Sequence, residues 1–253
     1  MEDFFQRLNK VSFSGKKVAW CVVTSTTGSS PRKAGSKMIV FEDATIIGSI
    51  GGGGVEKKVI DEALKVLKTK EPASFHFNLK EDLNMECGGT MDVYVEPVLP
   101  AEKLFVFGAG HIGKFIAKYA PDFDFDVTLI DERPEIIQTD ELNSGSFINK
   151  PFSEAIPLLN LNDDSYMVIV THKHINDEAI LRLVCKLPHK YLGMIGSRVK
   201  IAEIKKRLID EKVLTDEEFN RIDTPIGIKF AAETPQEIAL SILAKLIDVK
   251  NSK

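Results

Sequence analysis

Hydrophobic and polar positions follow different patterns in the two parts of the chain. Before about residue 97, short apolar runs bounded by polar turns or glycines predict strands. These runs cover residues 18–23, 37–41, 45–50, 75–79 and 91–95. After a glycine cluster, apolar residues recur at helical spacing and predict a helix; they are Val55, Val59, Ile60, Ala63, Leu64 and Leu67. Several strands with one clear helix are typical of an α+β domain, here of about 95 residues.

From about residue 103 onward, strands and helices alternate. Apolar runs predict strands at residues 104–107, 127–130, 167–170 and 191–195, and helical periodicity predicts helices at residues 112–120, 178–186, 199–210 and 235–249. This alternation is typical of a doubly wound, mostly parallel sheet. Between the two patterns, Pro97 and Pro100 resist both helix and central strand. We therefore expect a domain at residues 1–97, a linker at 98–102 and a second domain at 103–253.

Composition narrows the class of protein. With 43% hydrophobic and 28% charged positions in 253 residues, the chain is typical of soluble globular proteins, which excludes wholesale disorder. A net charge of −4 does not fit a general nucleic-acid binder, and no apolar run approaches the ~18 residues that span a bilayer. The first residues lack a basic segment followed by an apolar core, so we expect no signal peptide. The three cysteines have no paired spacing, which favours a reducing compartment and a cytoplasmic protein.

A glycine-rich turn opens the second domain. Gly108-Ala109-Gly110-His111-Ile112-Gly113 has the spacing G-x-G-x-x-G between a predicted strand and a predicted helix. Asp131 ends the next strand about 20 positions on, as a dinucleotide-binding fingerprint requires. We expect a Rossmann-type fold in which this turn meets an anion at the helix N-terminus. Asp131 would accept hydrogen bonds from a ribose, or Arg133 would bind an additional phosphate. The motif therefore does not decide which nucleotide binds. The alternative is that the glycines serve only a tight turn.

Two further loops in the first domain have the composition of ligand loops. Gly51, Gly52, Gly53 and Gly54 precede the predicted helix, and consecutive glycines suit a backbone that approaches an anion closely. The alternative is an ordinary flexible connection. The second loop is Gly28-Ser29-Ser30-Pro31-Arg32-Lys33, in which Arg32 could clamp a phosphate through two hydrogen bonds. A solvated surface turn explains that composition equally well.

The remaining candidates are single polar residues near predicted element ends. Cys87 lies beside two glycines, and a buried structural cysteine is the usual interpretation of such a thiol. His172 and His174 follow a predicted strand and could bond a ligand or transfer a proton, with Asp177 as an orienting partner; too few ligands are present for a metal site.

Two helix starts lie farther along the chain. Ser197 can cap a helix whose first residue, Arg198, could reach an anion. Thr234, Pro235 and Glu237 form a capping box, and this structural role is sufficient to account for these three residues.

Taken in order, these loops resemble the XdhC/CoxI family, the accessory factors of xanthine dehydrogenase and related molybdenum hydroxylases. The resemblance spans nearly the whole chain, and its individual pieces are modestly specific. The matching stretches are Thr27-Gly28-Ser29-Ser30-Pro31-Arg32, Gly48-Ser49-Ile50-Gly51-Gly52-Gly53, Val55-Glu56, Cys87-Gly88-Gly89, Phe107-Gly108-Ala109-Gly110-His111, Thr171-His172-Lys173-His174, Met194-Ile195-Gly196-Ser197-Arg198 and Glu233-Thr234-Pro235.

The resemblance implies an XdhC-type domain followed by a Rossmann domain. It implies a non-catalytic chaperone that binds molybdenum cofactor, the molybdopterin complex, and protects it for sulfuration and insertion into a hydroxylase. A cysteine desulfurase as sulfur donor and a homodimer follow as further expectations. One position departs from the family pattern G-G-G-C-V-E, because Gly54 stands where the family has cysteine. Three alternatives follow from this difference. Cys87 could take the place of the family cysteine, the protein could bind the cofactor through its backbone alone, or the family activity could have been lost.

Two other functions fit the same residues. A NAD(P)-dependent oxidoreductase would use the Rossmann domain for its cofactor, although no acid/base constellation for hydride transfer emerges from the sequence. A regulator or scaffold would keep the fold and the partner surface without the chemistry. Binding of dinucleotide separates the first of these from a cofactor chaperone.

Overall fold

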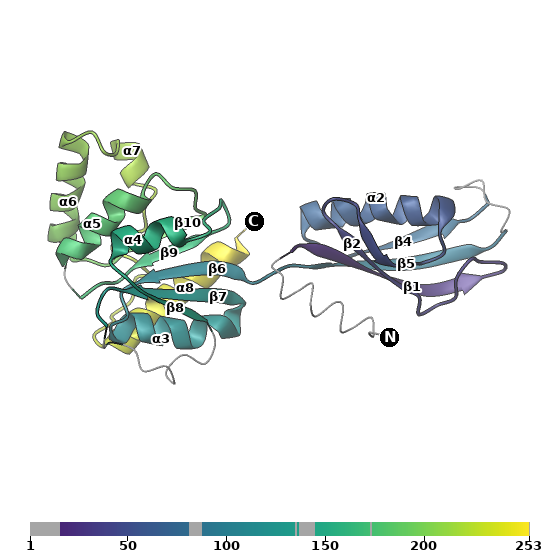
Figure 1. The fold of residues 1–253 in the computed structure, drawn as a ribbon, viewed down its shortest axis with the longest axis horizontal. Coiled ribbons are helices and arrows are strands. Elements are labelled where there is room, and N and C mark those ends of the chain that lie inside the picture. The colour runs from purple at the N-terminus through teal and green to yellow at the C-terminus, as the bar shows by residue number, and fades with distance from the viewer. Residues whose placement is uncertain (1–15, 81–87, 135, 137–144, 173, 253) are drawn as a thin grey trace. The chain divides into compact units, whose positions relative to one another are not determined.

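The computed structural model describes residues 16–80, 88–134, 136, 145–172 and 174–252. The chain divides into two compact units, Met1–Pro100 and Ala101–Lys253 (Figure 1), each with its own hydrophobic core. Every described helix is too short or too polar to cross a membrane.

Unit 1 is an antiparallel sheet covered on one face by a helix (Figure 1). Its described strands lie in the order β3 (Ile46–Gly48), β2 (Lys37–Phe41), β1 (Val18–Thr27), β5 (Thr90–Val98) and β4 (Ala73–Asn78). Helix α2 (Gly53–Thr69) packs on this sheet with Val55, Val59 and Ala63, because these residues repeat at the helical period and face the alternate buried residues of β1 and β5. The predicted helix and strands of this unit are therefore present, with Ile60 and Leu64 partly rather than fully buried.

The expected linker is shorter than its two prolines suggest. Strand β5 continues through Pro97 to Val98, where Pro97 pairs with Ala19 of β1. Strand β4 reaches only Val95 of β5, so Pro97 lies where β5 has a neighbour on one side. A proline is tolerated at such an edge because no ladder hydrogen bond is needed from its nitrogen on the open side.

Unit 2 has the parallel sheet that the alternating pattern predicts. The described strands lie in the order β10 (Tyr191–Met194), β9 (Tyr166–Ile169), β6 (Glu102–Phe107), β7 (Phe125–Asp131) and β8 (Ser146–Asn149), and all recorded pairs are parallel. Starting from β6, the chain adds β7 and β8 on one side and then crosses over to add β9 and β10 on the other side. The strand order reverses between β6 and β9, which is the topological switch point at which doubly wound folds bind ligands.

Helices cover both faces of this sheet (Figure 1). On one face, α3 (His111–Tyr119) and α8 (Pro235–Asn251) bury Ile116, Ala239 and Ile242 against it. The other face is covered by α4 (Phe152–Ala155), α5 (His174–Val184), α6 (Arg198–Asp210) and α7 (Asp216–Phe219). Two short 3-10 turns, Ala120–Phe123 and Ile156–Leu158, follow α3 and α4.

Candidate functional site

The glycine cluster of unit 1 wraps around a carboxylate of the same chain. Helix α2 begins at Gly53, and the preceding Gly51 and Gly52 have φ of 142° and 72°, values that favour glycine. One oxygen of Glu56 accepts hydrogen bonds from the Ser49 hydroxyl at 2.7 Å, from the Gly52 N–H at 3.2 Å and from the Ile50 N–H at 3.4 Å. The loop thus has the donors of an anion site, and Glu56 fills part of it. An external anion would have to use the first N–H groups of α2 or displace this carboxylate.

The other two loops of unit 1 lie beside this cluster. A Cβ added to Gly89 would come within 2.2 Å of the Thr27 carbonyl oxygen, and one added to Gly51 within 2.6 Å of the Pro31 ring. These contacts bring the segments around residues 28–31, 51 and 88–89 to one end of the sheet. The sequence predicts each of these as a separate ligand loop, and the structure brings their described residues together.

The nominated side chains in these loops differ in exposure. Ser29 and Arg32 are exposed, while Ser30 is half-buried and donates its hydroxyl to the Arg32 carbonyl oxygen at 3.0 Å. Gly54 lies exposed in the first turn of α2. A cysteine there would gain acidity from the helix N-terminus, so the glycine removes a reactive position.

Whether a cysteine thiol could serve as a reactive group or a ligand depends on its burial and its pKa. Cys87, nominated from the sequence, lies outside the described residues. Cys21 is buried in the core of unit 1, and burial raises the pKa of its thiol to about 12. The Cys185 thiol of unit 2 also has a raised pKa because it is partly buried. Neither of these two thiols is poised as a thiolate.

In unit 2, the fingerprint turn lies at the switch point. Gly113 packs so closely that an added Cβ would come within 1.9 Å of the Gly108 carbonyl oxygen, while a Cβ on Gly110 would meet no described atom within 4 Å. The first and third glycines are therefore needed for the turn and for helix packing, and Gly110 leaves room at the N-terminus of α3. His111 is the first residue of α3 and is exposed.

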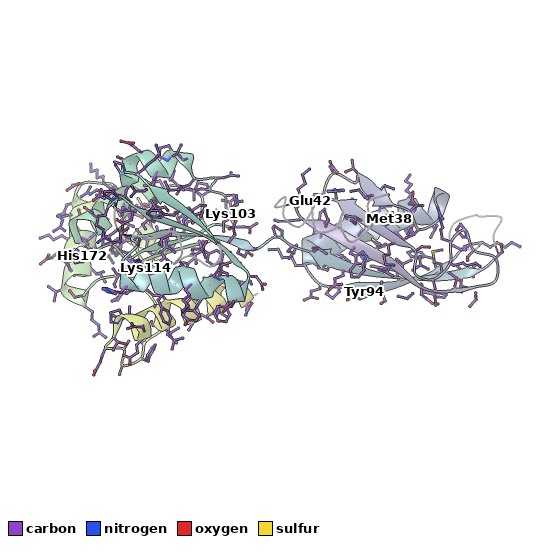
Figure 2. The ribbon with its side chains drawn as sticks, turned by 60° about the horizontal axis from the view of Figure 1, so that its bottom comes forward. Met38, Glu42, Tyr94, Lys103, Lys114 and His172 are labelled. Atoms are coloured by element: carbon purple, nitrogen blue, oxygen red, sulfur yellow. The ribbon has the colours of Figure 1, made fainter. Side chains whose placement is uncertain are left out.

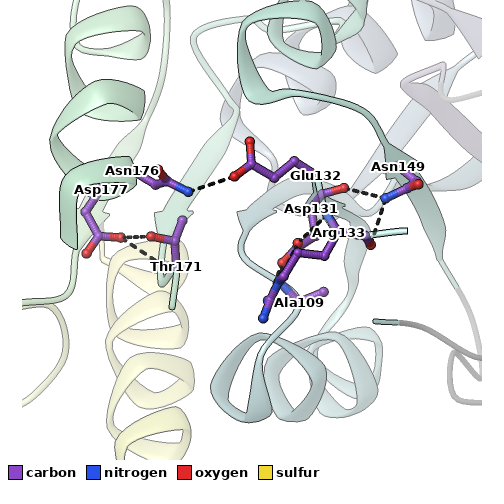
Figure 3. Close-up of polar contacts among 8 residues, drawn as sticks. All are labelled: Ala109, Asp131, Glu132, Arg133, Asn149, Thr171, Asn176 and Asp177. Carbon is purple, nitrogen blue, oxygen red and sulfur yellow. Dashed lines mark hydrogen bonds and ion pairs between the residues drawn. The ribbon is translucent and has the colours of Figure 1, made fainter. Parts of the chain in front are cut away.

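The acidic residue of the fingerprint is already bonded within the chain (Figure 3). Asp131 is 2% exposed and accepts from the Ala109 N–H at 2.7 Å, the Arg133 N–H at 3.0 Å, and the Arg133 guanidinium at 2.9 and 2.7 Å. Burial alone would raise the pKa of this carboxyl, but the hydrogen bonds and the arginine charge outweigh burial and hold the pKa below its ordinary value. Asp131 is thus ionised, and it anchors Arg133.

A small cleft opens beside this pair. It measures about 90 Å³ and is lined by Arg133, Glu132, Thr171, His172 and Asn176, among others. His172 is exposed at the end of the unit opposite Lys103 (Figure 2), which is the carboxyl end of the strands. For His174 the structure describes the backbone, which begins α5.

The polar residues that frame the cleft hold one another in place. Asp177 is buried and accepts from the Thr171 N–H at 3.0 Å and from its hydroxyl (Figure 3). The pairing of Asp177 with the histidines stays a prediction, because the side chain of His174 lies outside the described part of the structure. Asn176 donates to Glu132 at 3.0 Å across the cleft.

The last two nominated positions begin helices at the same edge of the sheet. Ser197 caps α6 by accepting from the Lys200 N–H at 3.4 Å, and the adjacent Arg198 is exposed. Thr234 and Glu237 form the expected capping box at the start of α8. These capping predictions are confirmed.

Some polar arrangements were missed by sequence analysis. Glu56 carried no predicted role, although an acidic residue in the first turn of a helix is a usable signal. On the sheet of unit 1, Asp92 accepts from Ser25 and bonds His76 Nδ1 at 2.6 Å, and the Ser25 hydrogen bond contributes most to its lowered pKa. These three residues come from three strands, so only the strand register brings them together. Within the described part of the chain, no three His, Cys, Asp or Glu side chains are grouped to hold a metal ion.

Comparison with known proteins gives two family matches. The model described as XdhC Rossmann domain matches residues 104–246, and the model described as XdhC and CoxI family matches residues 13–78. A crystal structure described as a xanthine dehydrogenase from Bacillus halodurans superimposes with a TM-score of 0.55 and 21% identity, covering 98% of this chain and 96% of that one. This likeness confirms the fold.

Three curated proteins are similar in sequence. The Escherichia coli (strain K12) protein YqeB, named as uncharacterized, is 31% identical over 99% of this chain and 47% of its own length. A Bacillus subtilis (strain 168) protein named as a probable xanthine dehydrogenase subunit is 26% identical over 64% of this chain and 47% of its own length. The molybdenum cofactor insertion chaperone PaoD from Escherichia coli (strain K12) is 22% identical over 94% of this chain and 85% of its own length. The chain spans about half the length of the first two relatives.

Proposed function

The chain belongs to the XdhC and CoxI family, and we propose from this membership that it is an accessory factor of a xanthine dehydrogenase-type molybdenum hydroxylase. In this role it binds molybdenum cofactor, protects it while sulfur is added, and supports its insertion into the hydroxylase. The protein acts as a cofactor chaperone rather than as an enzyme.

One observation carries the proposal. Both units match models of the family, and 94% of the chain aligns with a relative named as a molybdenum cofactor insertion chaperone. A match to the Rossmann unit alone would support only nucleotide-type binding, because that fold serves many functions. The match to unit 1 is what favours a cofactor accessory role over a general dinucleotide enzyme.

The donors of the two glycine turns fit the anionic part of this cofactor. In unit 2, the N-terminus of α3 at Gly110 and the Arg133 guanidinium would hold a phosphate. In unit 1, the exposed Ser29 and the first N–H groups of α2, at Gly53 and Gly54, would bind through hydrogen bonds. The cofactor itself supplies the molybdenum and its sulfur ligands.

Molybdenum and sulfur handling favour a soft thiolate from the protein. Gly54 has no side chain to supply one, and the Cys21 thiol is buried with a raised pKa. We therefore nominate Cys87 as the residue that handles sulfur. Binding through backbone alone is the competing possibility, and the Cys87→Ser variant separates the two.

The partners follow from the same proposal. A molybdenum hydroxylase would receive the cofactor, a cysteine desulfurase would supply sulfur, and a homodimer would be the working assembly. His172, His174 and Arg198 lie on segments at the carboxyl edge of the parallel sheet and would contribute to the ligand site of unit 2.

The test is retention of the isolated cofactor. Purified apoprotein is mixed with molybdenum cofactor and passed through gel filtration, and molybdenum and pterin are measured in the protein peak. We expect both to elute with the protein in equal amounts, and clean separation would contradict the proposal. The Cys87→Ser variant should lose sulfur transfer while it keeps the pterin; unchanged sulfur transfer would exclude the thiol. Tight NAD(H) binding with substrate-dependent absorbance changes would instead favour the oxidoreductase.

A further inference from the structure

The buried carboxylate at the end of β7 has its hydrogen-bonding capacity filled by the chain itself. An ionised carboxylate offers about four acceptor sites. Asp131 receives four N–H bonds, from the Ala109 and Arg133 backbone and from Nε and Nη2 of the Arg133 guanidinium. A ribose diol, which would donate to this carboxylate in a dinucleotide complex, therefore finds its acceptor sites occupied.

The hydrogen bonds to Asp131 use only some of the N–H donors of the Arg133 guanidinium. A guanidinium has five N–H donors, and Asp131 takes one from Nε and one from Nη2. The described hydrogen bonds of the guanidinium all go to Asp131, so the edge formed by Nη1 and the second Nη2 hydrogen is turned away from the carboxylate. The Arg133 side chain is 40% exposed, against 3% for Asp131. Asp131 thus fixes the plane of the guanidinium while its outer edge stays accessible.

Further contacts hold this arrangement rigid. The Asn149 amide donates to the carbonyl oxygens of both Asp131 and Arg133, at 2.8 and 3.0 Å, and so pins the backbone turn between them (Figure 3). Asn176 binds Glu132 at 3.0 Å, which restrains the nearby negative charge that would oppose an anion. Arg133 is therefore pre-oriented before any ligand arrives, which lowers the entropy cost of binding.

The adjoining cleft is the size of a single small group. Its volume of about 90 Å³ is well below the roughly 300 Å³ at which pockets begin to enclose drug-sized ligands. A phosphate fits such a space, whereas a nucleoside does not. The cleft lies at the end of β7 and β9, beside the glycine turn that follows β6, so a phosphate there could remain attached to a larger ligand outside the cleft.

We propose that Arg133 binds a phosphate monoester at this cleft and that Asp131 is its positioning residue rather than an acceptor for ribose. The site would select ligands by a terminal phosphate and discriminate against an unphosphorylated adenosine ribose. This inference deepens the proposed function by assigning the phosphate of the pterin cofactor to unit 2, and to that extent rests on it.

The test uses methyl phosphate as the probe and the isotope-labelled full chain as the receptor. Amide and arginine Nε–H resonances are followed by NMR during titration at constant ionic strength, for the wild type, Arg133→Gln and Asp131→Asn. Arg221→Gln is the matched control, because Arg221 is exposed and lines a different cleft. NAD⁺ is titrated in parallel as the ligand with a free ribose diol.

We expect saturable shifts at the Arg133 Nε–H and at the Ala109 amide with methyl phosphate. Arg133→Gln should weaken this binding roughly tenfold, the loss of about one charge-assisted hydrogen bond, and Arg221→Gln should leave it unchanged. Asp131→Asn should weaken it too and broaden the Arg133 Nε–H signal, which a merely structural role would not do. If Asp131→Asn does not fold, Arg133→Gln still decides the matter.

Two results would overturn the inference. One is methyl phosphate binding that Arg133→Gln does not weaken, or no saturable binding near Arg133. The other is NAD⁺ that binds more tightly than methyl phosphate and depends on Asp131. The cofactor-retention assay keeps the two proposals apart: phosphate binding without cofactor retention contradicts the chaperone function alone, and cofactor retention unchanged in Arg133→Gln contradicts this site alone.

Discussion

Glu56 provides the sharpest stability test of how the glycine cluster is held. Replacing it with alanine removes the acceptor of the bonds from Ser49, Gly52 and Ile50, at 2.7, 3.2 and 3.4 Å. A hydrogen bond to a charged group contributes about 1.5–3 kcal/mol, but Glu56 is only half-buried and the last of these bonds is long. We therefore expect a loss of about 2 kcal/mol for Glu56→Ala, similar to loss of a strong helix cap. Glu56→Gln keeps one acceptor oxygen and should lose about half as much.

The assay follows the fluorescence of Trp20 during thermal unfolding. Trp20 is the single tryptophan and lies in β1, so its signal reports unit 1. A loss of about 2 kcal/mol in a unit of this size lowers the melting temperature by on the order of 10 °C. Asp61→Asn is the control, since Asp61 is exposed on the same helix. Melting temperatures of both Glu56 variants that match the control would refute the idea that this carboxylate anchors the loop.

Three other predictions concern single residues. Gly113→Ala places a methyl group 1.9 Å from the Gly108 carbonyl oxygen, so unit 2 should lose about 3 kcal/mol in calorimetry, and an unchanged transition would show that the turn is not tight. Asp131 has a lowered pKa, so its stabilisation is present above the unfolded-state pKa of about 4 and is lost as pH falls through the folded pKa. The stability gap between wild type and Asp131→Asn should therefore be wide at neutral pH and shrink in acid; a gap independent of pH would contradict the ion pair. Cys21 should stay unmodified by a thiol reagent in the native protein and react after denaturation, as peptide mass spectrometry can check, because burial raises its pKa to about 12; native labelling would contradict its burial.

The architecture could be predicted from the sequence because each unit has a strong local period. The helix after the glycines and the alternation from residue 104 onward correspond to α2 and to the parallel sheet. The elements that were missed are short and carry no long apolar run: β8 is an edge strand of four residues, Ser146–Asn149, and α4 (Phe152–Ala155) and α7 (Asp216–Phe219) are four-residue helices. The continuation of β5 through Pro97 was missed because the proline is tolerated where β4 has already ended opposite Val95, and the sequence does not show where one strand extends past its neighbour.

The hydrogen-bond partners of the candidate side chains were less predictable than the turns and helix starts that carry them. The glycine turns, the Thr171–His172 segment and the capped helix at Ser197 were all found from short-range spacing. What the sequence could not tell is that the donors of these loops are already used within the chain, by Glu56 in unit 1 and by Asp131 in unit 2. Side-chain partners across loops depend on rotamers and on the register between elements, neither of which has a period along the chain.

The most direct measurement of the central claim is the ligand that the protein carries from the cell. The full chain is expressed in a molybdenum-replete host and purified without oxygen, then analysed by ligand mass spectrometry and metal analysis. The account predicts that molybdenum and a phosphorylated pterin co-purify in equal amounts, and that both decrease in Arg133→Gln but not in Arg221→Gln. Recovery of a nicotinamide dinucleotide in place of pterin, with no molybdenum, would contradict it.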